Sequence, residues 1–305
     1  MNIIQAIILG IVQGLTEFIP VSSTAHLIFA SRLTGLSQSL GAEQLTATIA
    51  VIQLGTLAAV FVYFARDIWA ICFAFVRDHL ALLLRRGGTA AAAAAGGAPD
   101  SRGGRGFWSQ LSNEARLGWL IFIGSLPIGV VGLVFKKQIE GTFTKNLWVI
   151  ATMMIVVALL LLVAERVGTR RRGMDELSLR DALAVGFAQV LALIPGASRS
   201  GSTMMGGLFA GETRETAARF SFLLSIPAIT ASGLLELKEA LEKLPAGQVA
   251  PLVVATFVSG LIGYASIWFL LRFLRTHSTG IFIGYRLIVG ALILGLLAFG
   301  RVQPF

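Results

Sequence analysis

The chain has little charge and almost no cysteine. Asp, Glu, Lys and Arg make up only 13% of its 305 residues, about half of their usual share in soluble domains. The single cysteine, Cys72, excludes an intrachain disulfide framework and a cysteine-based zinc site. Hydrophobic residues reach 55% and the mean hydropathy is +0.80. The polar fraction is too small for a sizeable soluble domain, so the composition predicts a protein of the lipid bilayer.

Six stretches are apolar and long enough to cross a membrane as helices. Four of them, at 45–65, 117–135, 147–164 and 249–271, contain no charged residue, and each can span ~30 Å of hydrocarbon. Two more lie at 220–235 and 281–300. The last contains Arg286, whose long side chain we expect to snorkel to the lipid headgroups. The sequence therefore predicts an all-α integral membrane protein with six transmembrane helices.

Two further apolar stretches, 3–31 and 182–211, are broken near their middle by Pro20 and Pro195. Proline removes a backbone donor and clashes with the preceding helical turn. Each stretch should therefore form two half-helices joined by irregular backbone, which is tolerated at membrane depth only where it lines a cavity or lies against protein. We interpret the two stretches as four re-entrant half-helices.

The broken stretches resemble each other in sequence. GIVQGLTEFIPVSS, beginning at Gly10, and GFAQVLALIPGAS, beginning at Gly186, share Gly-x-x-Gln-x-Leu, then Ile-Pro, then a serine three residues after the proline. This similarity favours an internal duplication. We divide the single membrane domain, 1–305, into a first repeat at about 1–165 and a second at about 180–305.

The net charge of +9 does not indicate a nucleic-acid partner, because the basic residues are scattered between apolar stretches. Most of them fall on one side of the predicted spans, which the positive-inside rule assigns to the cytoplasm. The two broken stretches then enter from opposite sides, as an inverted-topology repeat requires. We expect 67–84 to form an interfacial amphipathic helix and 85–106, rich in Ala, Gly and Arg, to form a flexible cytoplasmic loop.

The first break gathers groups suited to acid–base chemistry. Gln13 and Glu17 are four residues apart and share one helix face. Ser22, Ser23 and His26 follow Pro20 within a few residues. Ionisable groups at membrane depth usually serve function. The alternative is that Glu17 and His26 bond to each other only to fix helix packing.

The second break gathers groups suited to binding an anion. An arginine at membrane depth needs a compensating negative charge, and hydroxyl and N–H groups at the start of a half-helix bind phosphate oxygens. The alternative is a permanent structural pair of Arg199 with Glu17. The residues of this break are Ser198, Arg199, Ser200 and Thr203.

If the two breaks meet, they combine an acid, hydroxyls, an imidazole and an anion clamp. That set suits phosphoryl transfer, and a divalent cation, Mg²⁺ or Ca²⁺, could be held by Glu17 and diphosphate oxygens. The competing interpretation is a transporter or flippase of an anionic lipid or small anion, because secondary transporters share this architecture. The serine, histidine and glutamate cluster favours hydrolysis.

Two motifs carry a family resemblance. QGLTEFIPVSSTAHL, beginning at Gln13, and PGASRSGST, beginning at Pro195, resemble the signatures of undecaprenyl-diphosphate phosphatases, the BacA/UppP family. The resemblance runs from about Ile4 to Gly300. It implies six spans with four re-entrant helices, hydrolysis of a polyprenyl diphosphate lipid, and a bacterial inner membrane location. It leaves a homodimer open. The first break enters from the sparsely basic side, so we expect the site to face the periplasm.

Carried over to this sequence, the resemblance implies four catalytic residues, Glu17, Ser23, His26 and Arg199, with Glu17 also a metal ligand. It implies five substrate-binding residues: Gln13, Ser22, Ser198, Ser200 and Thr203. Gln13 departs from the commoner glutamate and puts any two-carboxylate metal site in doubt. Ser23 is our preferred nucleophile because His26, three residues on, shares its helix face, while His26 itself or a water stays open.

Overall fold

The computed structural model describes residues 1–36, 42–94, 107–135, 146–243 and 246–304. Within these ranges the chain is helical, with one isolated β-bridge between Arg172 and Glu212 and no strand. The predicted all-α class is therefore confirmed. Short 3-10 turns connect some of the helices, at η1 (Phe107–Gln110), η3 (Met174–Glu176), η4 (Leu191–Leu193) and η5 (Ala246–Gln248).

Six of the described helices are long and apolar enough to cross a bilayer, which confirms the predicted spans. Each corresponds to one of the apolar stretches of the sequence. They are α4 (Ala42–Tyr63), α6 (Asn113–Val134), α8 (Leu147–Val167), α11 (Arg214–Lys243), α12 (Val249–Leu274) and α13 (Gly280–Ala298).

The two remaining apolar stretches are each divided into two helices, as the prolines predict. The first forms α1 (Ile3–Phe18) and α2 (Ser23–Leu33), with Pro20 in the turn between them. The second forms α9 (Leu179–Val190) and α10 (Arg199–Phe209), with η4 and then Pro195 in between. None of these helices is long enough to cross the membrane alone. Re-entry from opposite sides stays a prediction.

Each broken stretch packs on a span from the other half of the chain. Helix α1 packs on α12, and α9 packs on α6. The motif glycines make both contacts close: a Cβ on Gly10 would lie 2.6 Å from the carbonyl oxygen of Ala255, and one on Gly186 would lie 2.3 Å from that of Gly124. Such an exchange of partners is what a two-fold relation between the repeats would produce.

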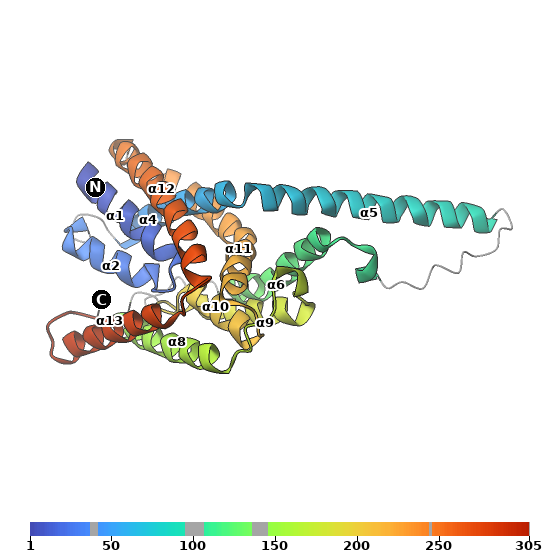
Figure 1. The fold of residues 1–305 in the computed structure, drawn as a ribbon. Coiled ribbons are helices and arrows are strands. Elements are labelled where there is room, and N and C mark those ends of the chain that lie inside the picture. The colour runs from blue at the N-terminus through green and yellow to red at the C-terminus, as the bar shows by residue number, and fades with distance from the viewer. Residues whose placement is uncertain (37–41, 95–106, 136–145, 244–245, 305) are drawn as a thin grey trace.

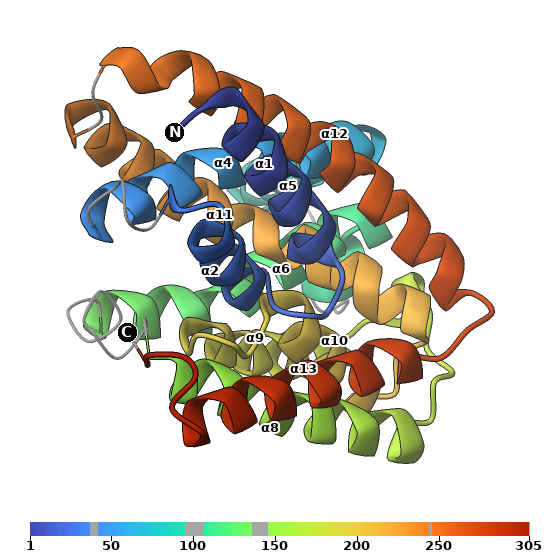
Figure 2. The same ribbon diagram turned by 90° about the vertical axis from the view of Figure 1, so that its left-hand side faces the viewer.

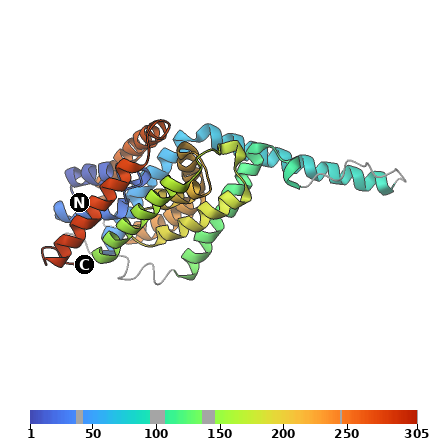
Figure 3. The same ribbon diagram turned by 60° about the horizontal axis from the view of Figure 1, so that its bottom comes forward.

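The long helix α5 (Ala65–Ala94) corrects one expectation. Residues 85–94, expected in a flexible loop, continue the helix, and the rest of that loop, 95–106, lies outside the described residues. Alanine is the best helix former, so the run Ala90–Ala94 can propagate a helix already started by α5. Figures 1 and 3 show α5 projecting beyond the other helices, at the end of the molecule away from both termini.

The four half-helices lie among the spans. Figure 2 shows α8 and α13 side by side along one edge, with α9 and α10 behind them and α1 and α2 toward the viewer. Contacts of α10 with α8, α9 and α11 place its start inside the bundle, where buried Met204 and Leu208 anchor it. This arrangement brings the turn after Pro195 toward the turn after Pro20.

Candidate active site

The two breaks meet at an ion pair. Arg199, the first residue of α10, donates from Nη2 to Oε1 of Glu17 near the end of α1, with 2.9 Å between these atoms. Ser200 Oγ donates to the carbonyl oxygen of Ile19 at 3.4 Å. We call this contact between the end of α1 and the start of α10 the junction. The side chains of Arg199 and Glu17 are only 14% and 6% exposed, so their attraction is weakly screened. The residues of the two motifs, far apart in sequence, form one cluster.

The carboxylate of Glu17 is surrounded by donors. Gln13 Nε2 donates to Oε2 at 3.0 Å, and Gln53 Nε2 of α4 donates to Oε1 at 3.2 Å. With Arg199, three side chains therefore donate to the carboxylate of this buried glutamate. Glu17 is not bonded to His26, so the packing alternative for that pair is not what the structure contains. Gln53 was not among the predicted site residues; its signal in the sequence is an amide inside an apolar span.

The serines that cap the second half-helices hold strained backbones. Ser22 and Ser198 are the N-caps of α2 and α10 and have φ of 79° and 67°. Non-glycine residues seldom adopt positive φ, at a cost of about 1–3 kcal/mol, and such residues cluster at functional sites. The turn after Pro195 needs glycine as well, because Gly196 has φ +89° and no space for a Cβ beside the carbonyl of Ile150.

These caps correct the alignment of the repeats. The sequence comparison matched Ser23 with Ser198, both three residues after a proline. In the structure Ser22 is the counterpart of Ser198, because each occupies the N-cap position of its half-helix and has a positive φ. The separation of Gln13 from Ser22 equals that of Gln189 from Ser198. The first break has one residue more than the second between the glutamine and the proline, and one residue fewer between the proline and the N-cap serine.

Two buried polar atoms near the junction have no partner. Arg199 Nη1 and Ser22 Oγ are inaccessible to solvent and make no hydrogen bond to the described residues. Leaving such a group unsatisfied costs about 1–3 kcal/mol, so an acceptor oxygen of a ligand would stabilise either group. The guanidinium arm that does not reach Glu17 is free to bind an anion.

His26 uses both ring nitrogens, and neither contacts Ser23. Its Nδ1 lies 2.7 Å from the carbonyl oxygen of Ser22, and its Nε2 lies 2.6 Å from the hydroxyl oxygen of Tyr285 on α13. Ser23 begins α2, is half-buried, and forms no side-chain hydrogen bond to the described residues. The predicted serine–histidine pair is therefore not formed here, although both residues lie at the same break.

The hydroxyls of the second break divide into two groups. Ser198 Oγ accepts from the Gly201 amide at 3.2 Å and lies 3.2 Å from Ser200 Oγ, so both serines lie at the start of α10. Thr203 is fully buried and donates to the carbonyl of Arg199, with Ser221 of α11 as a second partner. Thr203 thus fastens α10 to α11, and its hydroxyl does not face the Glu17–Arg199 pair.

Arg286 was wrongly expected to snorkel. It is fully buried and donates to backbone carbonyls of both breaks: Nη1 to Pro20 at 3.3 Å, and Nη2 to Gly196 and Ala197 at 3.0 Å each. Further bonds reach Met153 and Met154 of α8. Five carbonyls satisfy the guanidinium without a carboxylate. Arg286 links the two turns, and its signal in the sequence was a charge inside an apolar span.

The donor set around Glu17 does not make a complete metal site. Within the described residues no three His, Cys, Asp or Glu side chains lie together as metal ligands. Among the described residues, Glu17 is the carboxylate that pairs with the second break, and Gln13, Gln53 and Arg199 already donate to it. A divalent cation here would need most of its oxygens from the substrate.

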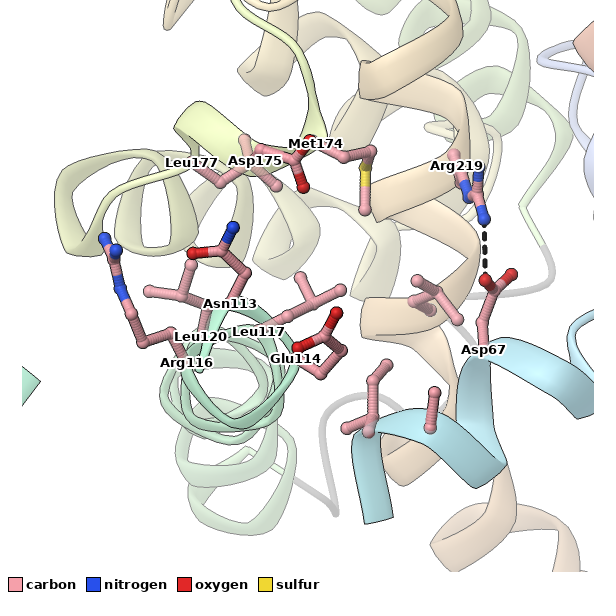
Figure 4. A pocket seen from close by; sticks show the side chains of 13 residues that line it. Asp67, Asn113, Glu114, Arg116, Leu117, Leu120, Met174, Asp175, Leu177 and Arg219 are labelled. Atoms are coloured by element: carbon pink, nitrogen blue, oxygen red, sulfur yellow. Dashed lines mark hydrogen bonds and ion pairs between the residues drawn. The ribbon is translucent and has the colours of Figure 1, made fainter. Parts of the chain in front are cut away.

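Two cavities lie elsewhere in the molecule. One of about 300 Å³ lies between α5, α6 and α11 (Figure 4), and another of about 290 Å³ is lined by Tyr63, Trp268 and Arg272. Both share the Asp67–Arg219 ion pair, and neither is lined by a residue of the two motifs. We place the chemistry at the junction of the breaks, where orphaned buried donors and an acid converge.

Comparison with known proteins identifies the family of the chain. A family model described as "Bacitracin resistance protein BacA" matches residues 6–292, which include both breaks. The chain belongs to the BacA family. Relatives named "Undecaprenyl-diphosphatase" come from Syntrophobacter fumaroxidans, 48% identical over 96% of this chain and 97% of the relative, and from Nocardia farcinica, 45% identical over 99% and 98%.

A third relative with the same name, from Myxococcus xanthus, is 45% identical over 100% of this chain and 92% of its own length. The similarity between this BacA protein and its relatives therefore covers the whole architecture.

Proposed function

We propose that this BacA-family protein hydrolyses undecaprenyl diphosphate to undecaprenyl phosphate and inorganic phosphate. One observation carries the proposal: the half-helix start at Arg199 presents an unpaired guanidinium nitrogen beside a buried glutamate from the other repeat. A diphosphate supplies the acceptor oxygens that this arrangement lacks. The names of the relatives give the lipid.

The product is the lipid carrier in its monophosphate form. Removing the terminal phosphate recycles this carrier for peptidoglycan synthesis, so the enzyme acts in cell-wall biogenesis. The protein is a multi-pass membrane protein, which matches a substrate whose polyprenyl chain stays in the bilayer while its diphosphate enters the junction of the breaks.

The side chains divide the work of phosphoryl transfer. Arg199 binds the terminal phosphate with a fork of N–H groups and neutralises the charge of the transition state. The hydroxyls of Ser22, Ser198 and Ser200 and the amides at the start of α10 orient the phosphate oxygens. Gln13 and Gln53 keep Glu17 in place, and Thr203 holds the first turn of α10.

For the attack we propose Ser23 Oγ, with His26 as the base. The Ser23 proton passes to His26 Nε2 as Oγ bonds to the terminal phosphorus, and the bond from phosphorus to the bridging oxygen breaks. Undecaprenyl phosphate leaves with the proton from His26. His26 then takes a proton from the water that attacks the phosphoserine and returns it to Ser23 Oγ as phosphate is released. The hydrogen bond from the Tyr285 hydroxyl to Nε2 must break before Nε2 can take the Ser23 proton.

For the cofactor we propose a divalent cation, Mg²⁺ or Ca²⁺, with Glu17 as its protein ligand. Such an ion neutralises phosphate charge when bound. The single carboxylate and its three donors support binding only together with substrate oxygens. Phosphate release measured across a chelator titration tests this, with Glu17→Gln as the variant that should lose the response.

For topology we propose that the junction opens to the periplasm across the bacterial inner membrane. The excess of basic residues in the predicted cytoplasmic loops supports this orientation. A Cys72→Ser background, in which exposed Cys72 is removed, allows single cysteines at the exposed positions Leu33 and Arg171. An impermeant thiol reagent on intact cells should label position 33 and not 171; the reverse pattern would contradict the orientation.

Purified protein in detergent tests the reaction itself. Phosphate release from a polyprenyl diphosphate with 55 carbons is expected for the wild type and for Arg219→Ala, whose pair with Asp67 lies away from the junction. Arg199→Ala should release essentially none. Lipid movement across vesicles without phosphate release would instead identify a flippase.

A further inference from the structure

Tyr285 lies beside the proposed base but belongs to neither motif. It is on α13, next in sequence to Arg286, and its hydroxyl oxygen lies 2.6 Å from Nε2 of His26. The two rings are stacked, with centroids 5.6 Å apart and planes at 14°. The tyrosine thus fixes both the position and the plane of the imidazole.

The two hydrogen bonds of His26 determine where its proton lies. The Ser22 carbonyl can only accept, so Nδ1, 2.7 Å away, must carry a hydrogen and donate it. In the neutral ring Nε2 then has a free lone pair and accepts a hydrogen bond from the Tyr285 hydroxyl. Nε2 is therefore the basic nitrogen, and it is the atom that Tyr285 holds.

His79 offers the same pattern with an unambiguous donor. Its Nδ1 lies 2.6 Å from the Phe75 carbonyl oxygen, and the indole N–H of Trp119 donates to its Nε2 at 3.0 Å. Since an indole nitrogen only donates, Nε2 of His79 must be the acceptor. The chain therefore contains an internal standard for this tautomer, and it has only three histidines.

We propose that Tyr285 is a positioning residue that holds His26 in the Nδ1–H form with Nε2 as the base. In the resting enzyme the Tyr285 hydroxyl donates a hydrogen bond to Nε2, and substrate binding breaks this bond. Tyr285 is 42% exposed, so it can move without opening the core. Arg286, its neighbour, is fully buried and holds this turn of α13 against both breaks. The catalytic consequence, though not the hydrogen bonding, rests on the proposed function.

Nitrogen NMR of protein with ¹⁵N-labelled histidine rings tests the bonding without any turnover. His26→Ala identifies the His26 signals by their loss. The wild type should give a protonated Nδ1 and an unprotonated Nε2 for His26, as for His79. Tyr285→Phe should move the Nε2 signal toward that of an unbonded acceptor and leave His79 unchanged. Tyr264→Phe, at a tyrosine whose ring packs against Tyr63 with an interplanar angle of 59°, should change neither.

Turnover tests the consequence. Tyr285→Phe should lower kcat roughly tenfold with KM within about twofold, because the base is less well oriented, whereas Tyr264→Phe should match the wild type. An Nε2–H tautomer for His26, or an Nε2 signal unmoved in Tyr285→Phe, would overturn the positioning role. If the NMR result holds but His26→Ala remains fully active, the hydrogen bond stands and the proposed role of His26 fails.

Discussion

The two breaks have the same backbone design and different chemistry. Both begin a half-helix at a serine with positive φ, yet Ser198 Oγ caps the Gly201 amide whereas Ser22 Oγ has no partner. The first break supplies an acid and an imidazole, and the second supplies a guanidinium and hydroxyls. The same backbone geometry thus occurs at both breaks, and the side chains give each break different chemical groups.

Removing the guanidinium of the second break should have the largest effect. We expect Arg199→Ala to lower the rate of phosphate release by about 10³-fold or more, because it removes charge neutralisation in a water-poor site. Arg199→Lys should also fail substantially, since a point charge cannot replace the fork. Arg219→Ala is the matched control in the same assay. Near-normal turnover of purified Arg199→Ala would separate the second break from catalysis.

Substitutions at the two adjacent serines of the first break should have different kinetic effects. Ser23→Ala should lower kcat by on the order of 10³ with little change in KM, as expected for a nucleophile. Ser22→Gly keeps the positive φ and removes only the hydroxyl, so it should raise KM with a smaller effect on kcat. Steady-state kinetics distinguishes them. A Ser23→Ala protein with more than about a tenth of wild-type kcat, which is ~1.4 kcal/mol, would move the attack to water or His26.

Removal of divalent cations should come next. Excess EDTA is expected to reduce phosphate release by roughly 100-fold, and added Mg²⁺ or Ca²⁺ should restore it, because the diphosphate has too much negative charge for Arg199 alone. Glu17→Gln, already impaired, should respond weakly to either treatment. Full turnover in excess EDTA would show that the first break needs no metal.

The link between the breaks should matter less for rate and more for stability. Arg286→Lys leaves several of the five carbonyls without a donor, at about 1–3 kcal/mol for each unsatisfied group. We expect a lower thermal unfolding midpoint in detergent and roughly tenfold slower turnover. Arg272→Lys, at an exposed arginine beside Trp268, should change neither quantity. An unchanged midpoint for Arg286→Lys would contradict the bridging role.

The smallest effect concerns Glu212, in the turn between α10 and the α11 span. Burial, and then the nearby Asp181, raises its pKa from 4.5 to about 8 against a smaller opposing effect of Arg172. The unfolded chain releases this proton near pH 4.5 and the folded one near pH 8. The free energy of unfolding should therefore fall as pH rises between these values, by on the order of 1 kcal/mol per pH unit.

Glu212→Gln is neutral at every pH and should not show this decline. Unfolding midpoints across pH 4.5–8, compared between the variant and the wild type, test it, with turnover at neutral pH expected to be unchanged. Parallel pH curves for the two proteins would mean that Glu212 is ionised in the fold.

The spans and the breaks could be predicted because they depend on local signals: charge-free length for a span and an internal proline for a break. The position of Arg199 at the start of a half-helix could be predicted for the same reason. What could not be predicted depends on distant contacts. Gln53 and Tyr285 lie in ordinary apolar helices, and only the packing of α4 and α13 brings them to Glu17 and His26.

Arg286 shows why a local rule can mislead. A single arginine inside a span can extend to headgroups or be buried among carbonyls, and the sequence of that span does not distinguish the two. Arg286 is buried because the carbonyl groups of two irregular turns need hydrogen-bond donors, which its guanidinium supplies. Similarly, the correct alignment of the two breaks pairs Ser22 with Ser198, because both have the same backbone conformation. Aligning the prolines instead had paired Ser23 with Ser198.

A double-mutant cycle on Glu17 and Arg199 tests most directly whether the two breaks act as one site. Phosphate release by purified wild type, Glu17→Gln, Arg199→Ala and the double variant would be measured with the same lipid substrate. If the paired groups act as a unit, the double variant is no slower than the slower single variant. Losses that multiply in the double variant would mean that the two breaks act independently, which contradicts this account.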